Sequence, residues 1–271
     1  ERFSERIVAS MPTGLIAFDS SGQATVLNGP ARTLFGSEGH KKGEHFRAIF
    51  LRFPALAEMV EERTGLPTVL ENDLRALTRA EHWFGEGRLV QSFAILTIGI
   101  GVGYGLVVHD QVVNHRDMGV GLVAHHPLDP NGPTCPEGHH GCARAMLTTT
   151  SISSQVSIAH GRSIEYDEAL ALARAGDAVA TEVLRSAGLA LGRLVAVVAN
   201  FAMPERIFLS GEGIELAVIA WESVRVGLER DRDPTASPVD VVVQPYDSDL
   251  WARGAAAIAI QHHVLGTSNG D

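Results

Sequence analysis

The stretch Q-S-F-A-I-L-T-I-G-I-G-V-G-Y-G-L-V-V-H-D-Q-V-V, residues 91–113, is the most hydrophobic part of this chain and decides its fold. Its glycines, at positions 99, 101, 103 and 105, argue against a long helix, because each glycine inside a helix costs about 1 kcal/mol relative to alanine. The pattern predicts two strands that flank a glycine-rich turn. The polar pair His109-Asp110 predicts a second turn directly after them.

Predicted helices and strands alternate on both sides of this hairpin. The short apolar run at 66–70 predicts a strand that ends at Glu71-Asn72-Asp73, and the helical period predicts a helix over 74–87. Further helices are expected at 166–177, 178–202 and 251–266, and further strands at 206–213 and 239–246. This alternation predicts an α/β fold with a largely parallel sheet.

Composition limits the class of protein. With 271 residues and 45% hydrophobic residues, the chain is long enough to bury a full core. The net charge of -10 argues against a nucleic-acid surface spread over the chain, because phosphate binding needs clustered Lys and Arg. We find no run of about 18 apolar residues and no opening signal peptide. We therefore expect a soluble cytoplasmic protein with no membrane partner.

Both cysteines of the chain lie in C-P-E-G-H-H-G-C, residues 135–142, together with His139 and His140. A further histidine, His125, precedes Cys135 by ten residues. In a reducing compartment such a Cys/His cluster is more often a metal site than a disulfide. Taken alone, these residues leave three alternatives: a metal site, a loop with two inert thiols, and a redox disulfide.

Several segments resemble the ROK family of bacterial sugar kinases and sugar-sensing transcriptional repressors, in order from about residue 54 to 265. They are END at 71–73, AEHWFGEGR at 80–88, LTIGIGVGYGLVV at 96–108, HPLDPNGPTCPEGHHGC at 126–142, NFAMPERIFLSGEG at 200–213 and WARGAAAIAI at 251–260. The resemblance implies the two-lobed actin-like, sugar-kinase fold, whose lobes are of the ribonuclease H-like type. It also implies self-association as a homodimer or tetramer.

The resemblance gives the cysteine stretch a meaning. Family members carry a zinc loop of the approximate form C-x-C-G-x-x-G-C, with a histidine ten residues before the first cysteine. Here His125, Cys135 and Cys142 match this pattern, and Glu137 stands where the middle cysteine is expected. Tetrahedral zinc needs four donors, so we expect His139 as the fourth, with His140 or Glu137 as alternatives. Zinc held by four protein ligands would be structural and would shape the sugar pocket.

The resemblance also assigns sugar-contacting positions. Asp73 matches the catalytic aspartate of the kinases, Asn72 its sugar-contacting neighbour, and His125 lies close to the sugar. Without the resemblance, the alternative for Asp73 is a helix N-cap. At the positions of two sugar-binding glutamates this chain has Leu122 and Arg144. Leucine cannot accept a hydrogen bond and arginine only donates. This exchange leaves a hexose under-recognised or favours a ligand with negative charge that pairs with Arg144. A solvent-exposed or salt-bridged Arg144 is an equal alternative.

The phosphate loops depart from the family pattern. Gly99, Gly101, Gly103 and Gly105 match the second phosphate loop, but Ile100 replaces a threonine and Tyr104 replaces a glycine. Glycines let backbone N–H groups approach a phosphate, and a tyrosine side chain is expected to obstruct it. The first phosphate loop has no convincing match. These departures imply a relic of the loop, with ATP and Mg²⁺ bound only if the chain is a kinase.

Residues 1–53 are expected to form a small α/β segment of different character. ERIVASMPTGLIAFDSSGQATVLNGPARTLFG predicts a helix, a hairpin of strands at 14–20 and 23–28, and a second helix. It resembles the start of a PAS sensor domain. The alternative is an incomplete or atypical N-terminal lobe. The expected domains are therefore 1–53, a ROK-type effector-binding domain at 54–265, and a tail at 266–271.

The pattern as a whole favours the ligand-sensing domain of a ROK-type transcriptional regulator that has lost kinase activity. Its ligand would be a carbohydrate or a phosphorylated or acidic derivative. The acidic chain shows no helix-turn-helix, so DNA binding would need a segment outside it. Two alternatives remain: a divergent ATP-dependent carbohydrate kinase, and a non-catalytic interaction module of a signalling protein.

Overall fold

The computed structural model describes residues 16–18, 24–27, 58, 61–63, 65, 69, 71–115, 121–246 and 249–265. The chain divides into two compact units, one before Glu71 and one from Glu71 onward. The first unit contains strands β1 (Ile16–Phe18) and β2 (Ala24–Leu27), which pair antiparallel and confirm the expected hairpin. Residues 58 and 61–63 are helical, and Val69 is not in a strand. The PAS-like resemblance and the tail otherwise fall outside the described residues.

The second unit is built on a five-stranded sheet with the order β5-β4-β3-β6-β7. Strands β3 (Phe93–Ile98) and β4 (Val102–Val108) form the expected hairpin, and β5 (Gln111–Val112) follows after a tight turn at His109-Asp110. Strands β6 (Arg206–Ser210) and β7 (Asp240–Val243) add in parallel to β3. The sheet is thus mixed rather than largely parallel, because β4 runs antiparallel to both of its neighbours, β3 and β5.

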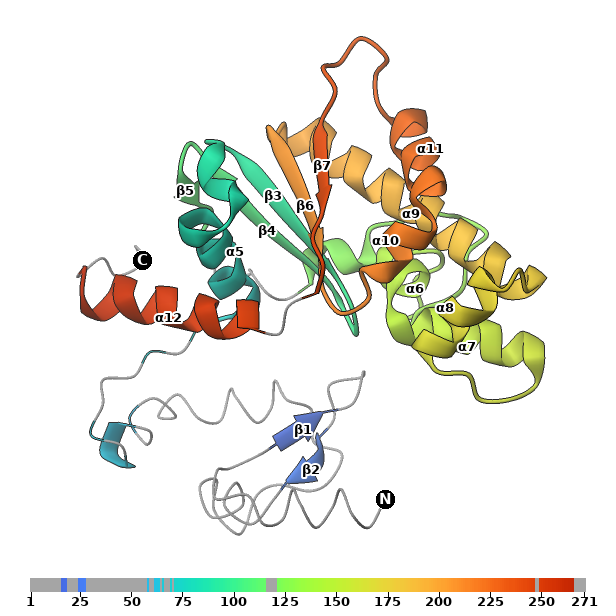
Figure 1. The fold of residues 1–271 in the computed structure, drawn as a ribbon, viewed down its shortest axis with the longest axis horizontal. Coiled ribbons are helices and arrows are strands. Elements are labelled where there is room, and N and C mark those ends of the chain that lie inside the picture. Colours follow the sequence, from blue (N-terminus) through green and yellow to red (C-terminus); the bar gives the residue numbers. More distant parts are fainter. Residues whose placement is uncertain are drawn as a thin grey trace. The chain divides into compact units, whose positions relative to one another are not determined.

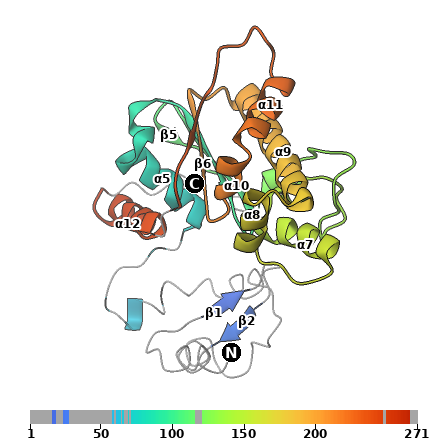
Figure 2. The same ribbon diagram turned by 45° about the vertical axis from the view of Figure 1, so that its right-hand side comes forward.

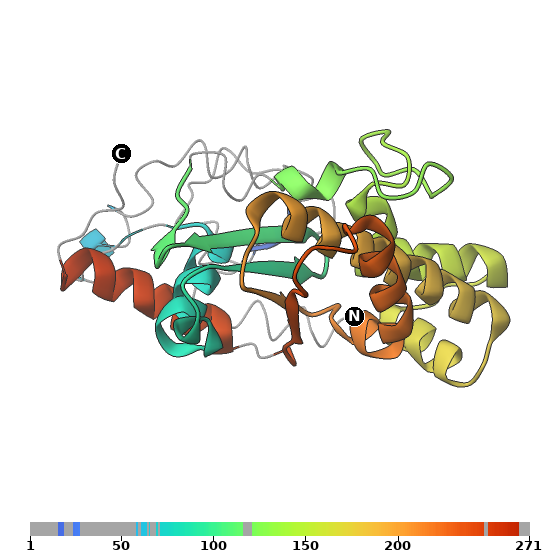
Figure 3. The same ribbon diagram turned by 90° about the horizontal axis from the view of Figure 1, so that it is seen from above.

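Helices cover both faces of this sheet. One face carries α5 (Asp73–Phe84), which packs against α12 (Asp249–His263), as Figures 1 and 2 show. Seen from above, the strands lie between this pair and a larger helical group (Figure 3). That group comprises α6 (Ala143–Leu147), α7 (Thr149–His160), α8 (Tyr166–Arg174), α9 (Ala178–Ala202), α10 (Glu215–Ile219) and α11 (Trp221–Asp231).

Strand alternation explains why residues 93–98 read as one apolar run. Phe93 and Ile95 are buried against Leu74 and Leu77 of α5 and Phe208 of β6. The alternate residues of β3 are buried in a second cluster with the larger helical group. Successive side chains of a strand point to opposite faces, so a sheet covered on both faces favours apolar residues at successive positions.

The start of α5 differs in detail from the sequence prediction. Asn72, not Asp73, is the N-cap: its side-chain oxygen accepts hydrogen bonds from the backbone N–H groups of Leu74 and Arg75, at 3.1 and 3.2 Å. Asp73 is the first helical residue, and its carboxylate accepts from the Leu74 N–H at 2.8 Å. Both side chains therefore satisfy backbone donors that the first turn leaves unpaired.

The four glycines of the hairpin divide into two pairs. Gly99 and Gly101 lie in the turn, whereas Gly103 and Gly105 lie inside β4. A Cβ added at Gly103 would lie 3.1 Å from the Leu74 side chain, and one at Gly105 would overlap the Thr78 hydroxyl. These two glycines let α5 approach the sheet. Only Gly99 and Gly101 therefore lie in the turn itself, because β4 follows it immediately, and the phosphate-loop relic stays a prediction.

Tyr104 also lies beyond the turn. It lies within β4, opposite Leu96, and its ring packs against the larger hydrophobic cluster. Burial raises the pKa of its hydroxyl to about 12, so the group is neutral near pH 7. The tyrosine does not stand in the turn, because strand alternation turns its side chain away from the α5 face.

Replacing Met203 with glycine is expected to stabilise the second unit by about 0.5–1 kcal/mol. Met203 ends α9 in the left-handed conformation, with φ 47° and ψ 47°, and its side chain is 77% exposed. Only glycine adopts this conformation without a steric penalty from Cβ. Urea denaturation would measure the change. Met203→Ala is the control, since it removes the side chain but keeps Cβ; an equal gain in both variants would contradict this explanation.

Among the described residues, no helix combines the length and hydrophobicity that a membrane span requires.

Candidate functional site

The second unit concentrates its loops at one edge of the sheet, which we call the carboxyl edge. It comprises the turn Gly99–Gly101 after β3, the loop 211–214 after β6, and the first residues of α5 and α7. The Gly213 N–H donates to the Ile98 carbonyl at 2.8 Å, and the Thr149 N–H donates to the Gly99 carbonyl at 2.9 Å. Open α/β sheets bind their ligands at the carboxyl ends of parallel strands. This edge is therefore the first place to expect a ligand.

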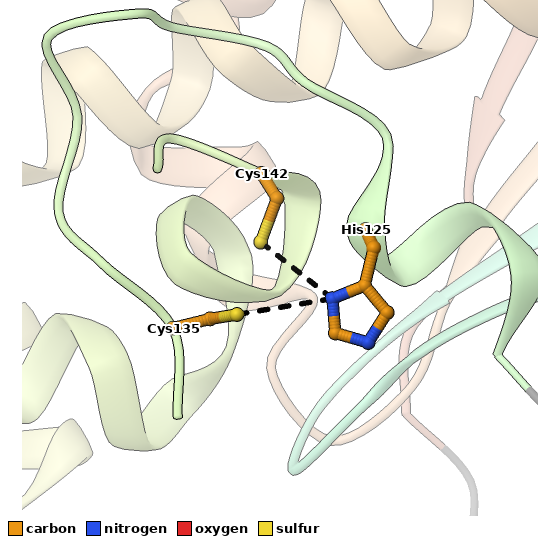
Figure 4. A group of neighbouring side chains, drawn as sticks. All are labelled: His125, Cys135 and Cys142. Carbon is orange, nitrogen blue, oxygen red and sulfur yellow. Dashed lines mark hydrogen bonds between the residues drawn. The ribbon is translucent and has the colours of Figure 1, made fainter. Parts of the chain in front are cut away.

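The predicted metal ligands meet in the loop that leads to α6. Short helix η2 (Leu122–His125) ends at His125, and α6 begins directly after Cys142. The His125 Nδ1 atom lies 3.8 Å from the Cys135 Sγ atom and 3.9 Å from the Cys142 Sγ atom (Figure 4). All three donor atoms lie within 4.8 Å of one another, and both cysteines are buried.

Backbone hydrogen bonds fix the loop that carries these donors. The Leu128 N–H donates to the Gly141 carbonyl at 2.8 Å, and the Cys135 N–H donates to the His139 carbonyl at 2.9 Å. A Cβ added at Gly141, whose φ is 51°, would overlap the Asp129 carbonyl oxygen. The approach of the two thiols to the imidazole is thus built into the path of the main chain.

The geometry of these donors suits zinc. Donors about 2.0–2.3 Å from a tetrahedral zinc ion lie roughly 3.3–3.8 Å from one another, close to the distances of the His125 Nδ1 atom from the two Sγ atoms. Burial raises the pKa of the Cys142 thiol, and the neighbouring Cys135 thiol acts in the same direction. A cation among the donors would oppose this shift by stabilising the thiolates. The arrangement therefore forms a possible His/Cys/Cys metal site.

The three candidates for a fourth ligand are placed differently. The His139 Nδ1 atom lies 3.5 Å from the Cys135 Sγ atom, and its ring centroid lies 4.5 Å from that of His125. The His140 Nδ1 atom instead pairs with the Thr134 hydroxyl at 2.9 Å. Glu137 pairs with Arg144. The contacts therefore favour His139, although it lies outside the group of three mutually close donors.

Glu137 and Arg144, two departures from the family pattern, contact each other. The Arg144 Nη1 atom donates to the Glu137 carboxylate at 2.7 Å. Partial burial alone would raise the pKa of Glu137, but the hydrogen bond from Cys135 and the charge of Arg144 outweigh it and hold that pKa below its usual range. The salt-bridged alternative for Arg144 thus has direct support. An anionic ligand at Arg144 would have to share the guanidinium with Glu137.

The remaining predicted positions are not among the donors of this loop. Leu122 is 71% exposed on η2, one turn before His125, so an apolar side chain faces solvent there. Asn72 and Asp73 begin α5 on the other face of the sheet, and Asp73 is exposed. Because the Asn72 amide oxygen caps the helix, only its NH₂ group is left to contact a ligand.

One residue of the carboxyl edge was missed in the sequence. Glu212, in Ser210-Gly211-Glu212-Gly213, accepts a hydrogen bond from the Ile100 N–H at 3.0 Å. The two residues are 112 positions apart. The available signal was a carboxylate between two glycines directly after a buried strand, but its partner could not be read from the pattern.

Comparison with known proteins shows which family this chain resembles. A profile of the ROK family matches residues 48–262. The chain is 26% identical over 213 residues to the DNA-binding transcriptional repressor Mlc of Escherichia coli, covering 75% of this chain and 52% of the repressor. It is 31% identical over 219 residues to a glucokinase of Thermotoga maritima, covering 75% of this chain and 69% of the kinase. The chain therefore spans about half the length of the repressor that it matches.

The solved structure of a ROK family transcriptional regulator, described as a homologue of Mlc, superimposes with a TM-score of 0.67. It is 25% identical and covers 90% of this chain and 59% of that one. The actin-like fold expected from the sequence is therefore confirmed, and the relatives include both repressors and sugar kinases. Since the family profile covers most of the chain, this protein belongs to the ROK family.

Proposed function

We propose that the domain assigned to residues 54–265 senses a carbohydrate or carbohydrate derivative for a transcriptional regulator and no longer phosphorylates it. One observation carries this proposal. The donors of the metal loop are assembled, whereas the positions expected to hold sugar-binding carboxylates contain an exposed Leu122 and an Arg144 engaged by Glu137. A binding function needs a shaped loop, but phosphoryl transfer also needs an oriented acceptor hydroxyl and bound ATP.

The proposal includes structural zinc held by His125, Cys135, Cys142 and His139. A closed set of four ligands leaves no position for substrate on the metal, so its contribution is to fix the loop. Five-residue helix α6 starts at the end of this loop and leads to α7, whose first N–H donates to the Gly99 carbonyl. A ligand-dependent change in the loop would in this way reach the carboxyl edge.

We propose that the ligand binds with fewer hydrogen bonds to protein carboxylates than a plain hexose would need. The Arg144 guanidinium pairs with Glu137, and a phosphate or carboxylate on the ligand would compete for it. DNA binding is assigned to a segment outside these residues, by analogy with the repressor relative, and a homodimer or tetramer is the proposed assembly. Neither depends on the identity of the ligand.

A divergent carbohydrate kinase is the second candidate, and one observation favours it. Asp73 is exposed at the first position of α5, within the carboxyl edge, where a carboxylate can accept a hydroxyl proton. In that case the turn Gly99–Gly101 would have to admit the phosphates of Mg²⁺-ATP.

Thermal-shift measurements with sugars, sugar phosphates and sugar acids test the sensor function. A ligand at 100 times its Kd stabilises the folded state by about 2.7 kcal/mol, or roughly 5–10 °C in Tm for a domain of this size. We expect such a shift with at least one acidic or phosphorylated sugar. Leu122→Glu, which places a carboxylate at an exposed position, is expected to move the preference toward uncharged sugars. No shift with any compound would contradict the proposal.

An ADP-release assay over the same panel separates the kinase. We expect no turnover above background. Turnover that is lost in Asp73→Asn would overturn the sensor proposal in favour of the enzyme. This variant keeps an oxygen that can accept from the Leu74 N–H, so helix α5 keeps its first turn.

A further inference from the structure

The carboxylate of Glu212 lies on the turn that follows β3. Its Oε1 atom accepts a hydrogen bond from the Ile100 N–H at 3.0 Å. A Cβ added at Gly99 would overlap the same carboxylate, so the side chain rests directly on the glycine backbone. The turn therefore offers a backbone N–H and an uncovered glycine to an anion, and the Glu212 carboxylate takes this position.

The loop around Glu212 holds this carboxylate in place. Gly211 has φ 104°, and a Cβ there would overlap the Ile98 carbonyl oxygen. On the other side, the Gly213 N–H donates to the Ile98 carbonyl at 2.8 Å, and the Tyr166 hydroxyl donates to the Gly213 carbonyl at 2.7 Å. The main chain on both sides of Glu212 is fixed to β3, so an exposed side chain has a defined direction.

Glycine turns at the carboxyl ends of parallel strands bind phosphates through backbone N–H groups. A phosphate oxygen that bonded the Ile100 N–H would need the position of the Glu212 Oε1 atom. The second carboxylate oxygen would lie beside it and repel a negative group. A ligand with several phosphate charges would thus find the Ile100 N–H already bonded and would be repelled by the charge of Glu212.

We propose that Glu212 is the residue that closes this turn to nucleotide phosphates, by occupying their place as an internal carboxylate. The inference rests on the proposed loss of kinase activity and gives that loss a cause at one residue. It also implies that the turn itself has kept the geometry for binding phosphate. Removing the carboxylate therefore opens a site for ATP or inorganic tripolyphosphate.

Isothermal titration of the whole 271-residue chain with Mg²⁺-ATP and with sodium tripolyphosphate tests this inference. We expect the wild type to bind neither below about 1 mM, and Glu212→Gly to bind both at least tenfold more tightly, a change of about 1.4 kcal/mol. Glu212→Gln should lie between them, because it removes the charge but keeps an acceptor oxygen. Glu165→Gln is the matched control: it removes one exposed carboxylate that makes no capping hydrogen bond at its helix and should bind like the wild type.

The inference would be overturned if the wild type bound Mg²⁺-ATP and tripolyphosphate as tightly as Glu212→Gly, whether both bind or neither does. Melting curves establish that each variant is folded before titration. The outcome is separable from that for the sensor function. If the wild type binds ATP without turning over any sugar, only this inference fails. If no sugar shifts the Tm while the Glu212 variants gain ATP binding, the sensor proposal fails and this inference stands.

Discussion

Replacing Cys142 with alanine is expected to abolish metal binding and to lower the stability of the second unit by about 3–5 kcal/mol, or roughly 10 °C in Tm. The Cys142 side chain is fully buried, and its Sγ atom lies 3.9 Å from the His125 Nδ1 atom. Loss of one thiolate leaves too few donors for a closed tetrahedral site, and the loop then loses the bonds that join its two ends. Zinc content by elemental analysis and thermal melting would measure the two effects.

The wild type should carry about one zinc ion per chain, as one closed tetrahedral site requires, and a strong chelator should lower its Tm. His139→Ala and His140→Ala form the matched pair that tests the fourth ligand. We expect zinc to fall in His139→Ala, whose Nδ1 atom faces Cys135, and to stay in His140→Ala, whose ring pairs with Thr134. Metal-free protein from a zinc-supplemented culture would contradict the site, and equal zinc in both histidine variants would contradict the ligand set.

Replacing Gly192 with alanine is expected to destabilise the second unit by about 3 kcal/mol, although alanine is the better helix former. Gly192 lies in α9, where a Cβ would overlap the Val224 carbonyl oxygen and lie 2.7 Å from the Leu228 nitrogen of α11. Backbone atoms cannot turn aside as a side chain can. The two helices must therefore separate along their whole contact, and the leucines and valines between them lose packing.

The facing glycine of α11 provides an internal check. A Cβ at Gly227 would overlap the Leu189 carbonyl oxygen of α9. Once one alanine has separated the helices, the second should cost less, so the double variant Gly192→Ala/Gly227→Ala should be less destabilised than the sum of the single variants. Gly101→Ala is the control, because a Cβ there meets nothing within 4 Å. Urea denaturation that showed Gly192→Ala as stable as Gly101→Ala would contradict the packing argument.

The local pattern predicted the elements well. The hairpin at 91–113 and the long helix at 178–202 follow from spacing between neighbouring residues, and the structure places β3, β4 and α9 there. The pattern did not separate Gly103 and Gly105, which lie inside β4, from Gly99 and Gly101 in the turn. Glycines at alternate positions form the same sequence pattern whether they lie in a loop or in a strand. Only the close approach of α5 explains why Gly103 and Gly105 have no side chains.

The candidate site was predictable in its residue types but not in its contacts. His125, Cys135 and Cys142 were recognisable because the spacing of metal ligands is short and specific. The partner of a salt-bridged Arg144 was not, since Glu137 lies seven positions away in a loop whose path the pattern does not give. The cap at Asn72 instead of Asp73 was a difference of one position, within the precision to which a helix start can be read from a pattern.

By itself, then, the sequence determined the α/β class, the family, the donors of the metal loop and the departures from the sugar-kinase pattern. These properties depend on residue type and on spacing along a short segment. The tertiary structure alone decided that Glu212 covers the turn at Gly99, that Arg144 is engaged by Glu137, and that α9 and α11 meet at glycines. Some of these contacts join segments that are far apart in the chain. Others join residues that a loop brings face to face. They exist only when the packed core fixes the path of the backbone between them.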